Sequence, residues 1–486
     1  MSDDGRLLIP GETCWRVETA ERFGCIIDAA DYFLHAKSAM LHAQRRIMLI
    51  GWDFDTRMTF ERGDKTLSGP NRLGTFLRWL LRTRPKLEIY VLISNLGMVP
   101  ALQRVWHGMT PAFLVSSLSS SRMRFAVDGT HPTGSVHHQK IAVIDDELAF
   151  CGGLDFTIAR WDTSEHGHHN RSRRAVGRYY PPRHEVAAAV DGAAARALSE
   201  QARDRWQAAV GQSLTPVDAA KSVWPRDLEP ILRDTGVAIA RTLPALDTDE
   251  EVREVETLNL AAIAAAQRTI YLENQYLASR KLADALAARL QEPDAPEIVI
   301  VLPRNSESRI EEHAMDGARH RLLHMLWEAD EYDRLGVYWP VTDGGEPIYV
   351  HSKVLVCDDR LLRIGSSNLN NRSLGFDSEC DLAVEADRRR PDAEDVRRAI
   401  VSLRDRLVCE HLGVAVDELE QAMDDCGSFL RAIETLRGQG KTLRRFTDRT
   451  VAGEASPLAE NDLMDPDHVP RSLPESVQRF IAGLTD

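Results

Sequence analysis

HQKIAVID at residues 138–145 returns at residues 351–358 as HSKVLVCD. In each copy Lys follows His after two positions and Asp follows His after seven. The agreement continues downstream, because Asp155 and Asn368 each stand seventeen positions after the His of their own copy, behind a pair of small residues. Two stretches with the same chemistry at the same spacing predict two halves of one active site.

Each copy has the pattern of a buried strand with a polar start. An apolar run rich in β-branched residues follows the Lys in both copies. Residues two apart on a strand point to the same face, so His138 and Lys140 should project side by side, as should His351 and Lys353. We therefore expect each copy to deliver an imidazole and an ammonium to one point.

The choice of lysine is informative. Only eight of the 60 basic residues are Lys, yet both motif positions carry it. Random choice would give that pairing in roughly 2% of cases, and a compact ammonium is not equivalent to a guanidinium. Two imidazoles and two ammoniums that converge form a receptor for an anionic tetrahedral group, most simply a phosphodiester. The same cations would repel a metal ion, so we expect no metal and no other cofactor.

These residues resemble the two His-Lys-Asp motifs of the phospholipase D superfamily. More specific similarity to the phospholipases lies in GGLDF at residues 152–156, GSSNLNNRS at 365–373 and YLENQY at 271–276. The resemblance runs from about Cys14 to about Gly413. It implies two α/β/α lobes related by a pseudo-twofold axis, with mixed β-sheets packed together and a single shared active site at the lobe interface.

Length and patterning also favour two lobes. The chain of 486 residues exceeds what one core usually supports, and helical patterns alternate with buried apolar runs along both halves. Among the expected helices are residues 25–45 and the Ala-rich residues 187–206. The predicted divisions are an N-terminal catalytic lobe over residues 1–211, a linker over 212–245, a C-terminal catalytic lobe over 246–413, and a helical extension with an acidic tail over 414–486.

Phosphodiester cleavage at such a site follows from the chemistry of imidazole. One neutral ring attacks phosphorus and forms a phosphohistidine, the other gives a proton to the departing alcohol, and water or an acceptor alcohol then reverses the step. The resemblance implies that His138 is the nucleophile and His351 the acid. A carboxylate behind each ring would fix its tautomer. We predict Glu379 behind His351 and, because HEV at residues 184–186 resembles the family segment with the equivalent acid, Glu185 behind His138.

The remaining motif positions have different predicted roles. Asp145 and Asp358 lie at an odd offset from their His, on the opposite face of a straight strand, so we assign them to structure. The resemblance implies that Asn368 is a site residue, whereas an Asp at the matching position faces a phosphate unfavourably unless a lysine offsets it. The positions expected near the phosphate are Gly153, Asp155, Ser366 and Asn368.

Two further patterns have ordinary explanations. EHGHH at residues 165–169 looks like a metal-binding cluster, but it lies in a charged, Arg-rich stretch, and we expect a solvated or substrate-proximal loop without metal. Residues 429–446 combine apolar and basic side chains, as a membrane-facing helix would. Gly438 and Gly440 interrupt that pattern, so we expect a packed C-terminal helix pair, followed from Ala455 by a poorly ordered tail.

Composition narrows location and substrate. Seven Cys without clustered spacing suggest a reducing compartment, and the sequence has neither an apolar run of eighteen residues nor a secretory signal. We therefore expect a cytoplasmic protein with at most peripheral membrane contact. The net charge of −14 makes nucleic acid an unfavourable partner. Candidates for an apolar lipid-binding mouth are Trp106, Met109, Phe113, Leu114 and Tyr349.

Three functions remain open. The first is a phospholipase D that hydrolyses glycerophospholipids such as phosphatidylcholine to phosphatidic acid and free head group, with transphosphatidylation to alcohols. The second is a phosphatidyltransferase of the cardiolipin-synthase type, or another phosphodiesterase or nuclease of the superfamily. The third is a non-catalytic lipid-binding protein, which the intact His and Lys of both copies disfavour. The sequence leaves head-group preference and oligomeric state unknown.

Overall fold

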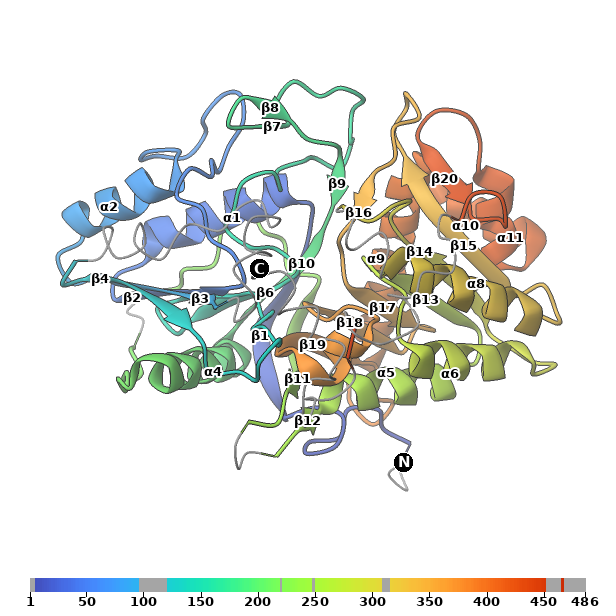
Figure 1. Ribbon diagram of the computed structural model, residues 1–486, viewed down its shortest axis with the longest axis horizontal. Coiled ribbons are helices and arrows are strands. Elements are labelled where there is room, and N and C mark those ends of the chain that lie inside the picture. Colours follow the sequence, from blue (N-terminus) through green and yellow to red (C-terminus); the bar gives the residue numbers. More distant parts are fainter. Residues whose placement is uncertain are drawn as a thin grey trace, which may run out of the picture.

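One sheet runs through both halves of the protein. The computed structural model describes residues 5–95, 120–218, 221–246, 250–307, 315–451 and 465–466. Within these ranges the N-terminal half, blue to green, and the C-terminal half, yellow to red, lie side by side (Figure 1) and share a mixed sheet of 16 strands. The predicted α/β class is confirmed, and the sheets of the two lobes form one continuous sheet.

The N-terminal half occupies one side of this sheet. Its strands, in sheet order from the centre outward, are β1 (Arg16–Ile27), β10 (Val186–Asp191), β6 (Leu148–Gly152), β5 (Ile141–Ile144), β2 (Arg46–Gly51), β3 (Glu88–Ser94) and β4 (Met123–Asp128). Its helices are α1 (Ala29–His42), α2 (Leu73–Thr83) and α4 (Gly192–Val210). Three short strands lie outside the sheet, namely β7 (Arg174–Ala175), β8 (Arg178–Tyr179) and β9 (Arg183–His184).

The C-terminal half repeats the arrangement. Its strands from the centre outward are β11 (Leu232–Leu243), β19 (Glu379–Glu385), β18 (Leu361–Gly365), β17 (Val354–Cys357), β13 (Thr269–Glu273), β14 (Glu297–Val301), β15 (Leu335–Val341) and β20 (Thr442–Arg445). Two short strands accompany them, β12 (Val252–Arg253) on β11 and β16 (Tyr349–Val350) on β9. The helical segments are α5 (Glu254–Ala265), α6 (Arg280–Leu290), α8 (Gly317–Ala329), the π-helix η3 (Arg372–Phe376), α9 (Ala393–Leu412), α10 (Val416–Cys426) and α11 (Phe429–Leu436).

The two halves meet at the long central strands β1 and β11. These strands pair antiparallel, from Arg16 opposite Ile239 to Phe23 opposite Leu232. Outward from this seam the strands of each half follow in the same order. First comes β10, which follows Glu185, or β19, which begins at Glu379. The two strands of a motif copy come next, and parallel strands follow. This is the pseudo-twofold relation that the resemblance implies. The lobe boundaries stay a prediction, but residues 232–243 of the predicted linker form the central strand β11.

The apolar core has three parts that follow this symmetry. One cluster lies on the face covered by α4 and α9 and is continuous across both halves. Each of the other two clusters lies within one half: one is under α1 and α2, and one is under α5, α6 and α8. Strand β10 is buried on both faces, with Val186, Ala188 and Val190 in the shared core and Ala187 and Ala189 in the N-terminal one. Such two-sided burial gives a continuous apolar run without alternation.

Several predicted elements differ from the structure. The Ala-rich helix expected over residues 187–206 begins only at Gly192, because the preceding residues form β10, and the helix expected from Cys25 begins at Ala29. The predicted C-terminal helix pair is a helix, α11, followed by the strand β20 on the sheet edge. The tail from Ala455 lies outside the described residues except for 465–466. None of the described helices is long and apolar enough to cross a bilayer.

Candidate active site

The two motif copies lie at equivalent places beside the seam. His138 and Lys140 precede β5, and His351 and Lys353 precede β17, so each pair stands immediately before its strand. The prediction that these residues lie inside the strand is therefore wrong by a few positions. The side chain of His138 is 16% exposed and that of His351 is 8% exposed, while both lysines are buried.

A carboxylate from the opposite half lies behind each imidazole. His138 Nδ1 lies 2.9 and 3.1 Å from the two oxygens of Glu379, and His351 Nδ1 lies 2.8 Å from Glu185 Oε1. Both predicted acids thus stand behind the predicted imidazoles, but the predicted pairing of Glu379 with His351 and of Glu185 with His138 is wrong. The pairs are crossed between the lobes.

Backbone contacts across the seam explain the crossed pairing. The His138 N–H donates to Ser378 O at 2.9 Å, and the His351 N–H donates to His184 O, also at 2.9 Å. Each acceptor is the residue directly before an orienting acid. The parallel pairing of β9 with β16 holds the second contact in register. Each motif segment is therefore anchored beside the acid of the other half.

Each lysine is held by residues of its own half. Lys140 Nζ donates to the carbonyl of His138 at 2.8 Å and lies 3.4 Å from Asp155 Oδ2. Lys353 Nζ donates to the carbonyl of His351 at 2.7 Å and to Gln275 Oε1 at 3.1 Å. These contacts hold both ammoniums next to the imidazoles.

The small residues after the second strand of each copy make close contacts. A Cβ on Gly153 would lie 3.1 Å from Glu185 Oε2 and 3.1 Å from the carbonyl of His351, so glycine lets the other half approach. Its counterpart Ser366 donates to Glu379 Oε2 at 2.5 Å. Both predicted positions therefore lie next to an orienting acid.

Asp155 and Asn368 are both buried beside the site. Asp155 Oδ1 accepts the backbone N–H groups of Trp52 at 2.8 Å and Asp53 at 3.3 Å, and Lys140 offsets its charge. The side-chain oxygen of Asn368 accepts no hydrogen bond from the part of the chain that the structure describes. The Asn368 side-chain oxygen is thus available to accept a hydrogen bond, whereas Asp155 Oδ1 already accepts two from backbone N–H groups.

The motif aspartates serve the backbone. Asp145 accepts the N–H groups of residues 44–46 at 2.7 to 2.8 Å, and Asp358 accepts those of residues 267–269 at 2.8 to 2.9 Å. Each thereby ties the turn after its motif strand to the start of the neighbouring strand, β2 or β13. Both stand where the sequence argument assigned them, in structure rather than in proton transfer.

Burial dominates the electrostatics of the site. It lowers the pKa of His138 well below the usual value, assisted by Lys140 and Lys353. It does the same to His351, assisted chiefly by Lys353. Burial also lowers the pKa of Lys353 to about 7 and raises that of Glu379 to about 8. The charges of both lysines lower the pKa of each imidazole, so the four groups are electrostatically coupled. A bound anion would favour the protonated forms of the imidazoles and lysines.

The structure adds residues that the sequence argument did not place in the site. Gln275, the partner of Lys353, also donates to the hydroxyl of Tyr349 at 2.9 Å, and the Tyr349 ring stacks on His351 with 6.3 Å between centroids. The Arg183 guanidinium also lies over the Tyr349 ring, 4.7 Å from its centroid. The YLENQY segment was the available signal for Gln275. The other candidates for a lipid mouth, Trp106, Met109, Phe113 and Leu114, lie outside the described residues.

The EHGHH segment, expected as a solvated or substrate-proximal loop, is exposed except at His166 and Gly167. His166 is fully buried and contacts Asp162 and Glu410. His168 and His169 remain exposed.

Two pseudo-twofold halves that bring two His-Lys motifs and two acids together form the arrangement that the resemblance to the phospholipase D superfamily implies. Two models of this family match the second half of the chain. One is described as "Cardiolipin synthase, PLD-like domain" and covers residues 260–399, and the other is described as "Phospholipase D" and covers residues 342–457.

Individual proteins are similar at low identity. Phospholipase D A of Dictyostelium discoideum is 22% identical over 80% of this chain and 35% of its own length, and phospholipase D1 of Saccharomyces cerevisiae is 22% identical over 88% and 31%. The chain thus spans about a third of the length of these relatives. The crystal structure of phosphatidylserine synthase from Haemophilus influenzae shares the fold, with a TM-score of 0.51, 16% identity, and coverage of 85% of this chain and 95% of that one.

Proposed function

We propose that this chain is a phospholipase D. It hydrolyses glycerophospholipids such as phosphatidylcholine at a membrane surface, to which it binds peripherally, and gives phosphatidic acid and the free head group. The observation that carries the proposal is the pair of crossed imidazole–carboxylate contacts with a buried lysine beside each ring. The similarity to curated phospholipases D supports the choice of lipid as substrate.

In the first step His138 attacks phosphorus. Donation of Nδ1–H to Glu379 leaves the lone pair on Nε2, which forms the P–N bond while the bond from phosphorus to the head-group oxygen breaks. His351, protonated, gives its Nε2 proton to that oxygen. Lys140 and Lys353 offset the charge on the non-bridging oxygens.

In the second step the same groups work in reverse. His351, now neutral, takes a proton from water, the water oxygen bonds to phosphorus, and the P–N bond to His138 breaks. Phosphatidic acid leaves and both imidazoles return to their first protonation states. An alcohol in place of water gives the transphosphatidylation product, so hydrolysis and transfer share one intermediate.

The roles of the two rings follow from how firmly each is held. Both oxygens of Glu379 lie within hydrogen-bond distance of His138 Nδ1, and Ser366 fixes that carboxylate. An attacking ring needs a set direction, which supports His138 as the nucleophile. A general acid must begin protonated, and an arriving phosphodiester anion favours the protonated form of His351 against the burial that lowers its pKa.

A phosphatidyltransferase is the second candidate. The match to the family model described as cardiolipin synthase favours it, since a lipid alcohol would then replace water as the acceptor. Both candidates use the same covalent step, so the acceptor distinguishes them.

The test is to incubate the purified full chain with phosphatidylcholine vesicles in ethanol-containing buffer, and separately with phosphatidylglycerol. Phosphatidic acid together with phosphatidylethanol supports the phospholipase D. The transferase is supported instead if the incubation with phosphatidylglycerol gives cardiolipin and the incubation with phosphatidylcholine releases no choline. H138A and H351A proteins serve as blanks, and equal product with the blanks overturns both candidates.

A further inference from the structure

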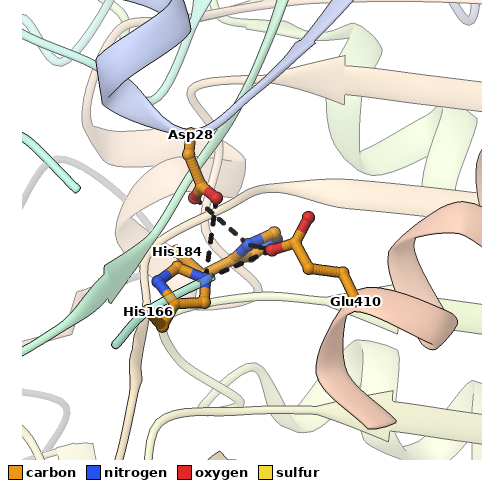
Figure 2. A group of neighbouring side chains, drawn as sticks. All are labelled: Asp28, His166, His184 and Glu410. Carbon is orange, nitrogen blue, oxygen red and sulfur yellow. Dashed lines mark hydrogen bonds and ion pairs between the residues drawn. The ribbon is translucent and has the colours of Figure 1, made fainter. Parts of the chain in front are cut away.

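A second cluster of titratable side chains lies buried behind the catalytic pair. Asp28 precedes α1, His166 comes from the EHGHH segment, His184 from β9 and Glu410 from α9 (Figure 2). Asp28 is 1% exposed, both rings are fully buried, and the Glu410 side chain is 9% exposed. Three of these residues belong to the N-terminal half and Glu410 to the C-terminal half, so the cluster spans the lobe interface.

The donor atoms of this cluster are spaced like ligands around one small cation. His184 Nδ1 lies 2.9 Å from Glu410 Oε1 and 3.3 Å from Asp28 Oδ1, and His166 Nε2 lies 3.2 Å from Glu410 Oε1 and 3.6 Å from Asp28 Oδ2. Four ligands at about 2.0 Å from a tetrahedral ion are about 3.3 Å apart. One atom from each of the four residues can be chosen so that all lie within 4.8 Å of one another.

The outer nitrogens of both rings have carboxylate partners. Asp162 Oδ2 lies 3.0 Å from His166 Nδ1, and Glu273 Oε2 lies 3.0 Å from His184 Nε2. Such carboxylates fix the tautomer of metal-binding imidazoles and orient the other nitrogen towards the ion. Arg173, 3.0 Å from Asp162, offsets the charge of that outer acid.

One carboxylate oxygen in the cluster accepts no hydrogen bond. Asp28 Oδ2 is buried, lies 3.6 Å from His166 Nε2, and has no hydrogen-bond partner among the described residues. A buried carboxylate oxygen of this kind is costly unless a cation pairs with it. Two carboxylates and two neutral imidazoles around a divalent ion make a neutral group, which suits burial.

The surrounding charges favour a cation at this point. Asp28 and Glu410 each lie close to both imidazoles, and Asp162 lies behind His166. A metal ion would supply the positive charge between these carboxylates, with release of any imidazole protons on binding.

We propose that Asp28, His166, His184 and Glu410 bind one first-row divalent transition-metal ion, with Zn²⁺ as the best fit, in a closed structural site. Two imidazoles and two carboxylates suit zinc better than calcium or magnesium, which prefer oxygen ligands. Four protein ligands leave no open position for catalysis, so the ion holds the halves together. This revises the sequence-based expectation that the segment binds no metal.

The site is coupled to the catalytic pair through backbone. Asp28 Oδ1 accepts the N–H of Glu185 at 3.1 Å, and the Asp28 N–H donates to the Glu185 carbonyl at 2.7 Å. Glu185 in turn contacts His351, whose N–H donates to the carbonyl of the ligand His184. Metal binding therefore positions one catalytic imidazole without touching the substrate.

The test uses the wild-type full chain first. Metal content is measured by mass spectrometry after growth with added zinc, and thermal unfolding is followed after treatment with a strong chelator and after return of Zn²⁺, Ca²⁺ or Mg²⁺. We expect about one zinc per chain and a melting temperature that falls by roughly 5–10 °C on chelation and recovers with Zn²⁺ alone. Less than a tenth of an equivalent, with no shift from Zn²⁺, overturns the proposal and leaves an ion-pair network.

Matched variants locate the ion. H166A and E410Q should each lose the zinc, whereas H168A should retain it. His168 is the right control because it is exposed two residues from His166 and belongs to a separate group with His169 and Glu346 that also has metal-like spacing. If H168A loses the zinc and E410Q retains it, the ion is bound by that exposed group and the assignment is overturned. The wild-type measurements decide the matter if H166A fails to fold.

Discussion

The two copies of the motif have matching backbone contacts but hold their acids differently. Glu379 contacts His138 through both oxygens and accepts a hydrogen bond from Ser366. The other acid, Glu185, lies 2.8 Å from His351, but neither of its oxygens accepts a well-aligned hydrogen bond from any described residue. The symmetry of the fold thus supplies two imidazoles, and single side chains make them unequal.

The difference fits a division of labour between attack and proton transfer. A ring that attacks phosphorus must keep one direction, and the more firmly held His138 meets that need. A ring that alternates between giving and taking a proton gains less from a rigid partner. Four experiments test this comparison, ordered by the size of their expected effects.

Removal of the rings should separate the two roles most strongly. We expect H138A to lower kcat by at least about 10⁴-fold with any substrate, because no nucleophile remains. H351A should lose about 10²- to 10⁴-fold with phosphatidylcholine. With a p-nitrophenyl phosphodiester, whose leaving group needs no proton, H351A should recover formation of the covalent intermediate. The measurement is the burst of p-nitrophenol, and a burst in H138A but not in H351A would reverse the assignment.

Replacement of each acid by its amide should have the next largest effect. E379Q should lower kcat by about 10²-fold or more, because the amide no longer fixes the tautomer of the attacking ring. E185Q should cost less, since its contact with His351 is weaker. Steady-state kinetics of the two variants on one substrate give the comparison, with circular dichroism as the check on folding. A larger loss in E185Q contradicts the proposed difference.

The pH dependence should report the buried lysine of the second copy. Burial lowers the pKa of Lys353 to about 7, and the ammonium is the form that pairs with phosphate. The charged form is lost as pH rises through that value, so kcat/KM should fall up to tenfold per pH unit above about 7. K353R keeps its charge and should lack this alkaline decline, although its overall activity is lower. A flat wild-type profile between about pH 7 and 9 would exclude Lys353 as the titrating group.

Exchange of the small residues should have the smallest effect on rate. S366G removes the hydrogen bond to Glu379, which is worth roughly 0.5–1.5 kcal/mol, so kcat should fall about 2- to 10-fold. G153S should instead destabilise the fold, because its Cβ would lie 3.1 Å from the backbone oxygen of His351. Kinetics and melting temperature measured on both variants separate the effects. An unchanged kcat in S366G means that Ser366 does not govern the acid.

The sequence was sufficient to predict the repeated motif, the two imidazole–lysine pairs and both acids. The sequence did not predict which acid contacts which imidazole. Glu379 is close in the chain to His351, and only the contacts across the seam bring Glu379 to His138. The pairing depends on tertiary structure. Spacing within one copy carries no information about it.

Two local errors have the same physical origin. Residues 187–191 are Ala and Val followed by Asp, a composition that favours a helix at alanine, yet they form β10 because the sheet buries both faces of that segment. His166 was expected in solvent because of its charged neighbours, but Asp28, Asp162 and Glu410 surround it in the interior. In both cases partners distant in sequence override local pattern.

The ladder between β1 and β11 determines how the molecule comes apart. Backbone pairing runs along these long strands from Arg16 to Phe23, and one apolar core continues across the seam. Heating should therefore melt both halves in a single calorimetric peak. A half expressed alone would present a long bare strand edge, which is a template for aggregation.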